Sequence, residues 1–195
     1  MIAPNSEALS AYGSLKRAYT TARNFPDRVL HSRRRSEARR RVLQLERARS
    51  ILVVCYGNVC RSPYLEAVLC RALPGIQVTS AGFVGPGRQV PTNSLTLASQ
   101  CGIDLTEFRS RPLSRANAAS ADLVIVMDAG QGRHISQIYS VSPARVVVAG
   151  DLDPVVSPTR EILDPWGQSL DVFTSSFNRL DRCAATLIAL VRRGY

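Results

Sequence analysis

A cysteine and an arginine lie six positions apart in a short segment with a glycine and an asparagine between them. The segment reads Cys55-Tyr56-Gly57-Asn58-Val59-Cys60-Arg61-Ser62. Gly57 and Asn58 tolerate left-handed backbone conformations, so successive N–H groups can point into one nest for an anion. The Arg61 guanidinium can hold two phosphate oxygens in a fork, and these positive surroundings favour the nucleophilic thiolate form of Cys55. We therefore expect residues 56–62 to bind a phosphate dianion and Cys55 to attack its phosphorus.

The segments on either side of this loop indicate a strand and a helix. Residues 51–54 form a β-branched apolar run that is typical of a buried parallel strand. Ser62 is an expected helix N-cap, and Pro63 suits the first turn. The positive end of that helix would then point at the anion nest.

The rest of the chain from Ser50 onward alternates strand and helix patterns. We expect further strands over 76–79, 121–127 and 146–148, and helices over 93–100 and 170–192. Gly102 is a helix C-terminal signal. The order predicts an α/β fold with a doubly wound, four-stranded parallel sheet and helices on both faces. Ligands of such sheets bind beyond the carboxyl ends of the strands.

A phosphoryl-transfer site of this kind also needs an acid, and two Asp-Pro pairs are candidates. Asp153 precedes Pro154, and Asp164 precedes Pro165. Asp-Pro is a common turn dipeptide, and spacing alone does not choose between the two aspartates.

Residues 1–49 form a basic extension that precedes the predicted domain, residues 50–195. Of the net charge of +10, most lies in residues 1–50, which hold twelve basic and four acidic side chains. Two helical segments are expected there, around residues 9–19 and 32–49. A solvated tail or surface helix is the simplest interpretation, and contact with an anionic membrane surface is an alternative. We expect no nucleic-acid binding, because aromatic side chains do not interleave with the arginines.

Composition limits the remaining classes of function. No apolar run is long enough to span a bilayer, and no secretory signal is apparent, so we expect a cytoplasmic protein. The five cysteines are then reduced, and their spacing fits neither a disulfide framework nor a zinc site. We expect no metal and no cofactor. Cys70, Cys101 and Cys183 are expected to be core residues.

Four segments resemble the low-molecular-weight protein tyrosine phosphatase family, bacterial type. Residues 54–63 are similar to its phosphate loop, 79–82 to its Ser-Ala-Gly turn, 121–128 to its third strand ending in Met-Asp, and 164–167 to its Asp-Pro-Tyr loop. The resemblance covers about residues 50–193. It implies the phosphotyrosine phosphatase I-like fold and a protein-tyrosine phosphatase activity.

The resemblance also implies a role for each matching residue. Cys55 would be the nucleophile that forms a cysteinyl-phosphate, Arg61 the phosphate clamp and Asp164 the general acid and base. An aromatic residue follows the family's aspartate, and Trp166 does so here, which favours Asp164 over Asp153. Three further roles are implied: Ser62 would stabilise the Cys55 thiolate, Asn58 and Ser80 would support the loop, and Cys60 would form a reversible disulfide with Cys55, or would be a small packing residue.

The expected pocket mouth departs from the family pattern. Tyr56 replaces an aliphatic residue, Phe83 a threonine, and Trp166 a tyrosine. A pocket lined by these three rings would favour a phosphotyrosine over a phosphoserine. The resemblance further implies a phosphotyrosine protein as substrate, such as a bacterial tyrosine autokinase of exopolysaccharide assembly.

Two other functions fit the same fold. An arsenate reductase would need two further cysteines near the end of the third strand, and none follows Asp128 within ten residues. A phosphate-binding adaptor with a retired site would be expected to lack Cys55, Arg61 or Asp164, and all three are present.

Overall fold

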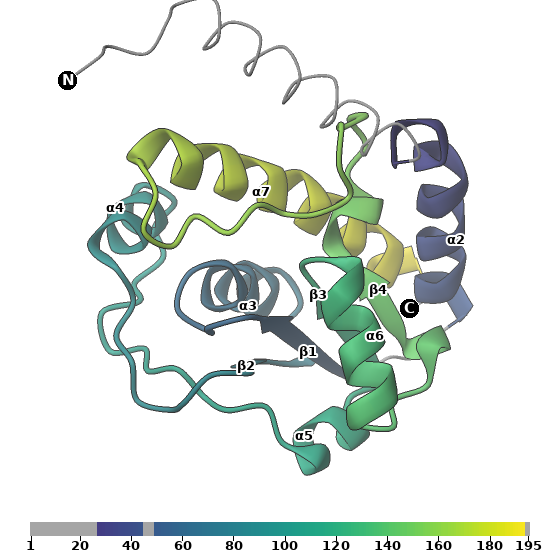
Figure 1. Ribbon diagram of the computed structural model, residues 1–195, viewed down its shortest axis with the longest axis horizontal. Coiled ribbons are helices and arrows are strands. Elements are labelled where there is room, and N and C mark those ends of the chain that lie inside the picture. The colour runs from purple at the N-terminus through teal and green to yellow at the C-terminus, as the bar shows by residue number, and fades with distance from the viewer. Residues whose placement is uncertain (1–26, 45–48, 194–195) are drawn as a thin grey trace, which may run out of the picture.

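The computed structural model describes residues 27–44 and 49–193, and in them four parallel strands form one sheet. The strand order is β2-β1-β3-β4 (Figure 1). The strands are β1 (Ser50–Cys55), β2 (Gln77–Gly82), β3 (Leu123–Val126) and β4 (Val146–Val148). The predicted α/β fold with a four-stranded parallel sheet is confirmed. From β1 the chain first adds β2 on one side and later β3 on the other. The end of β1 is therefore the switch point at which ligands bind in such sheets.

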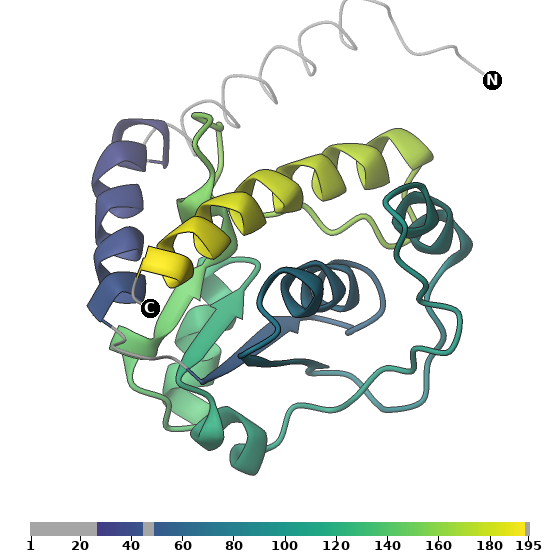
Figure 2. The same ribbon diagram turned by 180° about the vertical axis from the view of Figure 1, so that it is seen from behind.

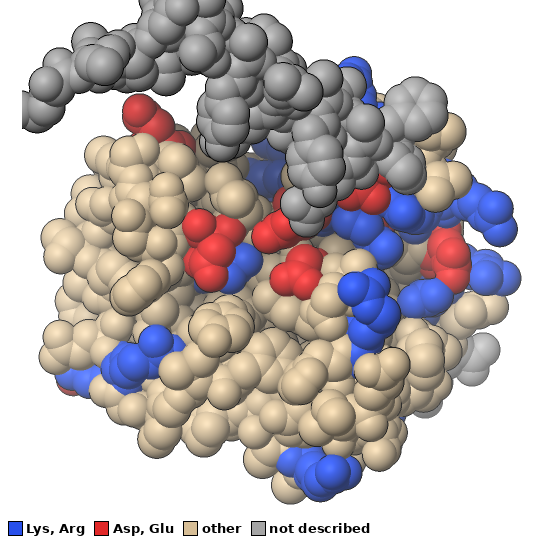
Figure 3. Space-filling view, in the orientation of Figure 1, with Lys and Arg blue, Asp and Glu red and all other residues tan. Residues whose placement is uncertain are grey.

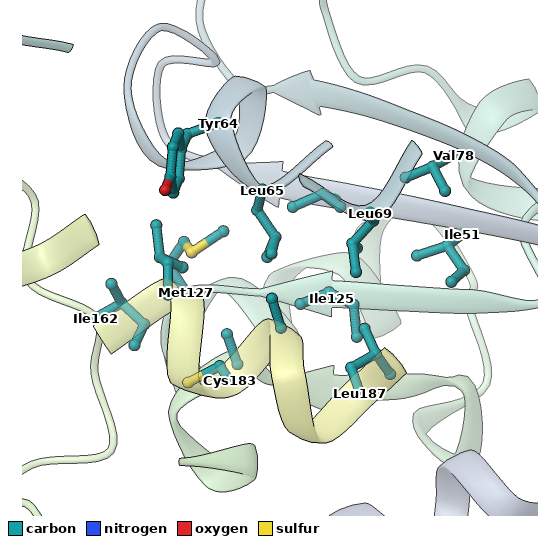
Figure 4. Close-up of a cluster of buried hydrophobic side chains, with 14 of the residues drawn as sticks. Ile51, Tyr64, Leu65, Leu69, Val78, Ile125, Met127, Ile162, Cys183 and Leu187 are labelled. Carbon is teal, nitrogen blue, oxygen red and sulfur yellow. The ribbon is translucent and has the colours of Figure 1, made fainter. Parts of the chain in front are cut away.

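Helices cover both faces of the sheet, and the alternation of side chains along β1 explains why both faces are apolar. Ile51 and Val53 point to one face, where α3 (Arg61–Ala72), α4 (Thr92–Gln100) and α7 (Leu170–Arg193) pack. Figure 4 shows this cluster, in which side chains of α3 and α7 meet those of the strands. Leu52 and Val54 point to the other face, which α5 (Arg115–Ser120) and α6 (Ala129–Ile138) cover.

Two sequence expectations differ from the structure near the site. The helix α3 begins at Arg61 with Cys60 as its N-cap residue, so Ser62 is not the cap that we expected. The Ser62 hydroxyl instead bonds to side chains of the preceding loop. The second strand runs on to Gly82, beyond the expected end at 79, because Gly82 continues the parallel ladder opposite Cys55.

The described part of the extension is a helix that packs on the domain. The helix α2 (His31–Gln44) lies beside α7 and the edge strand β4, as both views show (Figures 1 and 2). Ala38 and Val42 on its inner face are buried. The first expected helical segment, around residues 9–19, lies outside the described residues.

Charge is distributed unevenly over the surface. In Figure 3 Lys and Arg side chains gather toward α2, with acidic side chains among them, whereas the surface toward α4 is mostly uncharged. Among the described residues, the structure contains no helix with the length and apolarity that crossing a membrane requires.

Candidate active site

The Cys55–Ser62 loop connects the end of β1 to the start of α3. Asn58 adopts a left-handed conformation, with φ of 51°, and is fully buried. This conformation is uncommon outside glycine, and asparagine is among the residues that tolerate it best. The backbone can therefore turn sharply between the strand and the positive end of the helix, as the sequence suggested.

The thiol of Cys55 lies at the buried base of this loop. Its Sγ is 3.0 Å from the hydroxyl oxygen of Ser62, and the backbone N–H of Asn58 donates to it at 3.2 Å. Both groups can donate a hydrogen bond to the sulfur, so the Cys55 side chain is held at a fixed position at the base of the loop.

Asn58 and Ser80 support the Cys55–Ser62 loop through buried hydrogen bonds. The Asn58 side-chain N–H₂ donates to the hydroxyl of Ser62 at 2.9 Å and to that of Ser80 at 2.7 Å. Its side-chain carbonyl accepts from the backbone N–H of Arg111 at 2.7 Å. One buried amide thus ties the loop to β2 and to the segment after α4, which fixes the strained backbone.

Two residues of this support were missing from the sequence expectations. The Ser80 hydroxyl donates to a carboxylate oxygen of Glu66 at 2.6 Å, and the guanidinium of Arg111 forms an ion pair with the same carboxylate. Glu66 is one turn beyond the loop on α3, and this position next to a phosphate loop was the only available signal. Nothing in the sequence near Arg111 indicated that it would lie here.

Gly82 allows β2 to lie directly against the loop. A Cβ atom at this position would be 2.8 Å from the backbone nitrogen of Asn58 and 2.9 Å from the carbonyl carbon of Gly57. Any larger residue would push the loop away. On the outer side, Arg88 donates a hydrogen bond to the carbonyl of Gly57.

The guanidinium of Arg61 is almost completely buried and is held at two of its nitrogens. Its Nη1 donates to the carbonyl of Ile162 at 2.8 Å, and its Nη2 forms an ion pair with Asp164. Within the described part of the chain, its buried Nε has no hydrogen-bond partner. The Asp164 carboxylate, 41% exposed, thus faces the guanidinium that the sequence assigned to phosphate.

Two of the three expected rim residues are exposed. Tyr56 is 61% and Trp166 63% exposed, and the backbone N–H of Trp166 donates to Asp164 at 3.2 Å. Phe83 donates its backbone N–H to the carbonyl of Tyr56 at 2.9 Å. Its ring, however, packs edge-on against His134 of α6, with the centroids 5.1 Å apart.

Asp153, the other candidate acid, is fully buried and is bound by two arginines. Arg179 and Arg182 on α7 both donate to its carboxylate, at 2.8–3.0 Å. Burial alone would raise its pKa, but the hydrogen bonds from Arg182 and from the backbone of Val155, with the nearby charges, hold the pKa below its usual value. This carboxylate therefore links α7 to the loop before it, and Asp164 is the one that meets Arg61.

The remaining cysteines divide into two groups. Cys60 and Cys183 are buried, and burial raises the pKa of each to about 12. Cys70 and Cys101 are exposed, so the expectation that they are core residues is wrong. Cys70 lies in α3, where its thiol donates to the carbonyl of Val78 in β2, and Cys101 is the C-cap residue of α4. Among the described residues, no cluster of three or more His, Cys, Asp or Glu side chains could hold a metal ion.

The chain is similar in sequence to proteins that are named as phosphatases. The family described as low molecular weight phosphotyrosine protein phosphatase matches residues 50–194. The chain is 30% identical over 145 residues to the probable low molecular weight protein-tyrosine-phosphatase EpsP of Ralstonia nicotianae, covering 74% of this chain and 97% of that protein. It is 36% identical over 140 residues to the low molecular weight protein-tyrosine-phosphatase Wzb of Salmonella typhi, covering 69% and 88%.

A solved structure gives the same assignment. The crystal structure of the Erwinia amylovora tyrosine phosphatase amsI has a TM-score of 0.67 at 28% identity, over 73% of this chain and 92% of that one. The family match over residues 50–194, the similar sequences and the solved structure agree, and the chain belongs to the low-molecular-weight phosphotyrosine protein phosphatase family.

Proposed function

We propose that this protein hydrolyses phosphotyrosine in proteins through a cysteinyl-phosphate intermediate. The observation that carries the proposal is that one loop holds the Cys55 thiol against two hydrogen-bond donors, while Arg61, at the end of that loop, meets Asp164 from another segment. The proposed nucleophile, anion clamp and acid thus lie together beyond the carboxyl end of β1.

In the first step the Cys55 thiolate attacks phosphorus, and an S–P bond forms as the bond to the phenol oxygen breaks. The phosphate dianion takes the place of Asp164 on the Arg61 guanidinium, whose buried Nε is a further donor. Asp164, in its protonated form, gives its proton to the leaving phenolate.

In the second step water releases the phosphate. The Asp164 carboxylate accepts a proton from water as the water oxygen attacks phosphorus, and the P–S bond breaks. Cys55 leaves as a thiolate that accepts hydrogen bonds from Ser62 and from the backbone of Asn58. Arg61 and the loop N–H groups stabilise the charge on the phosphoryl oxygens in both transition states.

Tyr56 and Trp166 support an aromatic substrate. Both rings are more than half exposed, and Trp166 follows the acid by two residues. Exposed aromatic side chains beside a catalytic group offer flat surfaces for a phenyl ring. We propose a phosphotyrosine protein, such as a tyrosine kinase that phosphorylates itself, as the substrate.

We further propose that the extension brings the enzyme to anionic membranes. Arg28, Arg33 and Arg40 are exposed in the described part of the extension, and basic side chains are attracted to anionic lipid. Reversing these three charges to glutamate should weaken sedimentation with vesicles of phosphatidylglycerol. Reversal of three exposed domain arginines, Arg109, Arg115 and Arg192, is the matched control, and equal loss in both variants contradicts the idea.

The catalytic assignment is tested by hydrolysis of para-nitrophenyl phosphate and a phosphotyrosine peptide. Wild type, Cys55→Ser, Asp164→Asn and Asp153→Asn are compared, and arsenate reduction is measured with the same preparations. We expect no turnover with Cys55→Ser. We expect Asp164→Asn to lower kcat/KM for the phosphotyrosine peptide, whose leaving group needs a proton, by about a hundredfold or more. Asp153→Asn should cause a much smaller loss, once each variant is shown to be folded.

A folded wild type without hydrolysis would overturn the proposal. A larger loss with Asp153→Asn than with Asp164→Asn would overturn the choice of acid. Arsenate reduction that depends on Cys55 in the absence of phosphatase activity would establish the reductase function instead.

A further inference from the structure

The segment that carries Asp164 is held by its backbone at nearly every residue. Arg179 of α7 donates to the carbonyls of Thr159 and Glu161, both at 2.7 Å. Ile162 donates its N–H to the carbonyl of Met127 at 2.9 Å and accepts from Arg61. We call residues 159–164 the acid segment. Its position is therefore set by a series of bonds that begins at Thr159, five residues before Asp164.

A further hydrogen bond to the acid segment comes from the extension. The Asp27 carboxylate accepts from the backbone N–H of Arg160 through one oxygen, at 3.1 Å, and forms an ion pair with Arg34 of α2 through the other. The two bonds and the charge of Arg34 outweigh the effect of burial and hold the pKa of Asp27 below its usual value. Asp27 thus connects the acid segment to a helix that lies outside the region matched by the family.

Arg160 is also fixed from the other side. Its guanidinium donates through two nitrogens to the carboxylate of Asp151, which is buried in the 3₁₀ helix Ala149–Leu152. Its carbonyl lies so close to Gly150 that a Cβ atom there would be 2.0 Å away. The start of the acid segment is therefore clamped between the domain and Asp27. Figures 1 and 2 show the loop between β4 and α7 rising beside α2 and then running along α7.

We propose that Asp27 is a positioning residue for Asp164, so that the extension completes the acid segment of the enzyme. The inference rests on the proposed function, in which Asp164 protonates the leaving group. A general acid works only within hydrogen-bond reach of the oxygen that it protonates, and small displacements reduce its contribution steeply. Without the Asp27 carboxylate, the N–H of Arg160 loses its protein partner and the acid segment loses its outer clamp.

The test compares two substrates that differ in their need for an acid. Phenolate is a strongly basic leaving group, and para-nitrophenolate is a much weaker base that leaves with little help from a proton. For full-length Asp27→Ala we expect kcat/KM for phenyl phosphate to fall about fivefold, which corresponds to the net contribution of a typical intramolecular hydrogen bond. For para-nitrophenyl phosphate we expect a fall of less than about twofold. Equal factors for both substrates would overturn the proposal.

Two further variants separate positioning from general structure. Asp27→Asn keeps a carbonyl that can accept from Arg160 and should restore most of the loss. Glu37→Ala is the matched control, because Glu37 pairs with Arg41 of the same helix and, among the described residues, forms no hydrogen bond or ion pair with the acid segment. Glu37→Ala should leave kcat/KM for both substrates unchanged. A loss like that of Asp27→Ala would overturn the proposal.

A double-mutant cycle distinguishes failure of this inference from failure of the proposed function. In the Asp164→Asn background the effect of Asp27→Ala on phenyl phosphate should vanish, because the group that it positions is gone. If Asp27→Ala still lowers kcat/KM for phenyl phosphate by its full factor in that background, the role of Asp27 is overturned and the proposed function is not. If Asp164→Asn does not itself reduce turnover of phenyl phosphate, the acid assignment of the proposed function fails, and the role of Asp27 fails with it.

Discussion

Gly82 is the residue at which the shape of the Cys55–Ser62 loop is most directly tested. A Cβ atom here would be 2.8 Å from the nitrogen of Asn58, so Gly82→Ala must push the loop or β2 aside. We expect a loss of stability of about 1–3 kcal/mol and a fall of about ten- to a hundredfold in kcat/KM.

Gly85→Ala is the matched control for this prediction. Gly85 is exposed in the same connection, and a Cβ atom there would have no neighbour within 4 Å. It should behave like wild type in thermal unfolding and in hydrolysis. Full activity of Gly82→Ala would show that the close approach does not shape the loop.

Cys60 leads to a prediction about oxidation. Peroxide converts Cys55 to a sulfenic acid, and attack by the Cys60 sulfur would form a disulfide and release water. Burial raises the pKa of Cys60 to about 12, so its thiolate fraction increases about tenfold per pH unit over the neutral range. We therefore expect disulfide formation, and with it protection from irreversible oxidation, to be faster at pH 8.5 than at pH 6.5.

The measurement is the activity that dithiothreitol restores after a long exposure to excess peroxide. Wild type should recover more at the higher pH, whereas Cys60→Ala should recover little at either pH, because sulfinic acid is not reduced. Equal recovery by the two proteins would mean that Cys60 is only a packing residue.

At the scale of elements, the packing of α2 is the feature that extends the family domain. Val42 on its inner face is 5% exposed and its neighbour Leu43 is 48% exposed. We expect Val42→Ala to lower the free energy of unfolding by about 1–2 kcal/mol, since two buried methyl groups are lost. Leu43→Ala should change it by less than about 0.5 kcal/mol. Equal effects in denaturant titration would show that α2 does not pack on the domain in solution.

The sequence predicted those elements and site residues whose pattern lies within one segment. The Cys55–Ser62 loop was recognisable because a strand, a nest and a helix follow each other directly. The supports of that loop could not be found in this way, because Arg111 and Asp27 reach their partners only after the chain has folded. The helix α2 was expected as a surface helix, but its arginine-rich sequence gave no sign of the inner face at Ala38 and Val42.

For the whole molecule, the excess of arginine is partly a structural feature. Several arginines donate to backbone carbonyls of distant segments, which orders connections that lack regular secondary structure. Arg41 binds the carbonyls of Pro143 and Val146, Arg145 those of Ala119 and Ala121, and Arg179 those of Thr159 and Glu161. Several arginines therefore have a structural role within the fold, so the net charge of +10 by itself gives little support to a nucleic-acid surface.

The stability of the whole molecule in acid should depend on Asp153. Its folded pKa is held below the usual value of about 3.9, so the ionised carboxylate stabilises the folded state. This stabilisation is complete above the unfolded pKa and is lost as the pH falls through the folded one. Because Asp153→Asn leaves two arginines beside a neutral group, we expect it to cost about 3 kcal/mol at pH 7.

The cost should shrink as the pH falls below about 4, where the wild-type carboxylate becomes protonated as well. Asp151 changes the pH dependence of stability in the opposite direction, since burial raises its pKa. Because wild type and Asp153→Asn both contain Asp151, its contribution largely cancels in the difference between their stability curves. Asp171→Asn is the control, because Asp171 is an exposed acid in the first turn of α7 and should contribute less than about 1 kcal/mol. Urea titrations from pH 7 to pH 3 measure all three curves, and a difference that stays constant with pH would mean that Asp153 stabilises the fold by packing and not by its charge.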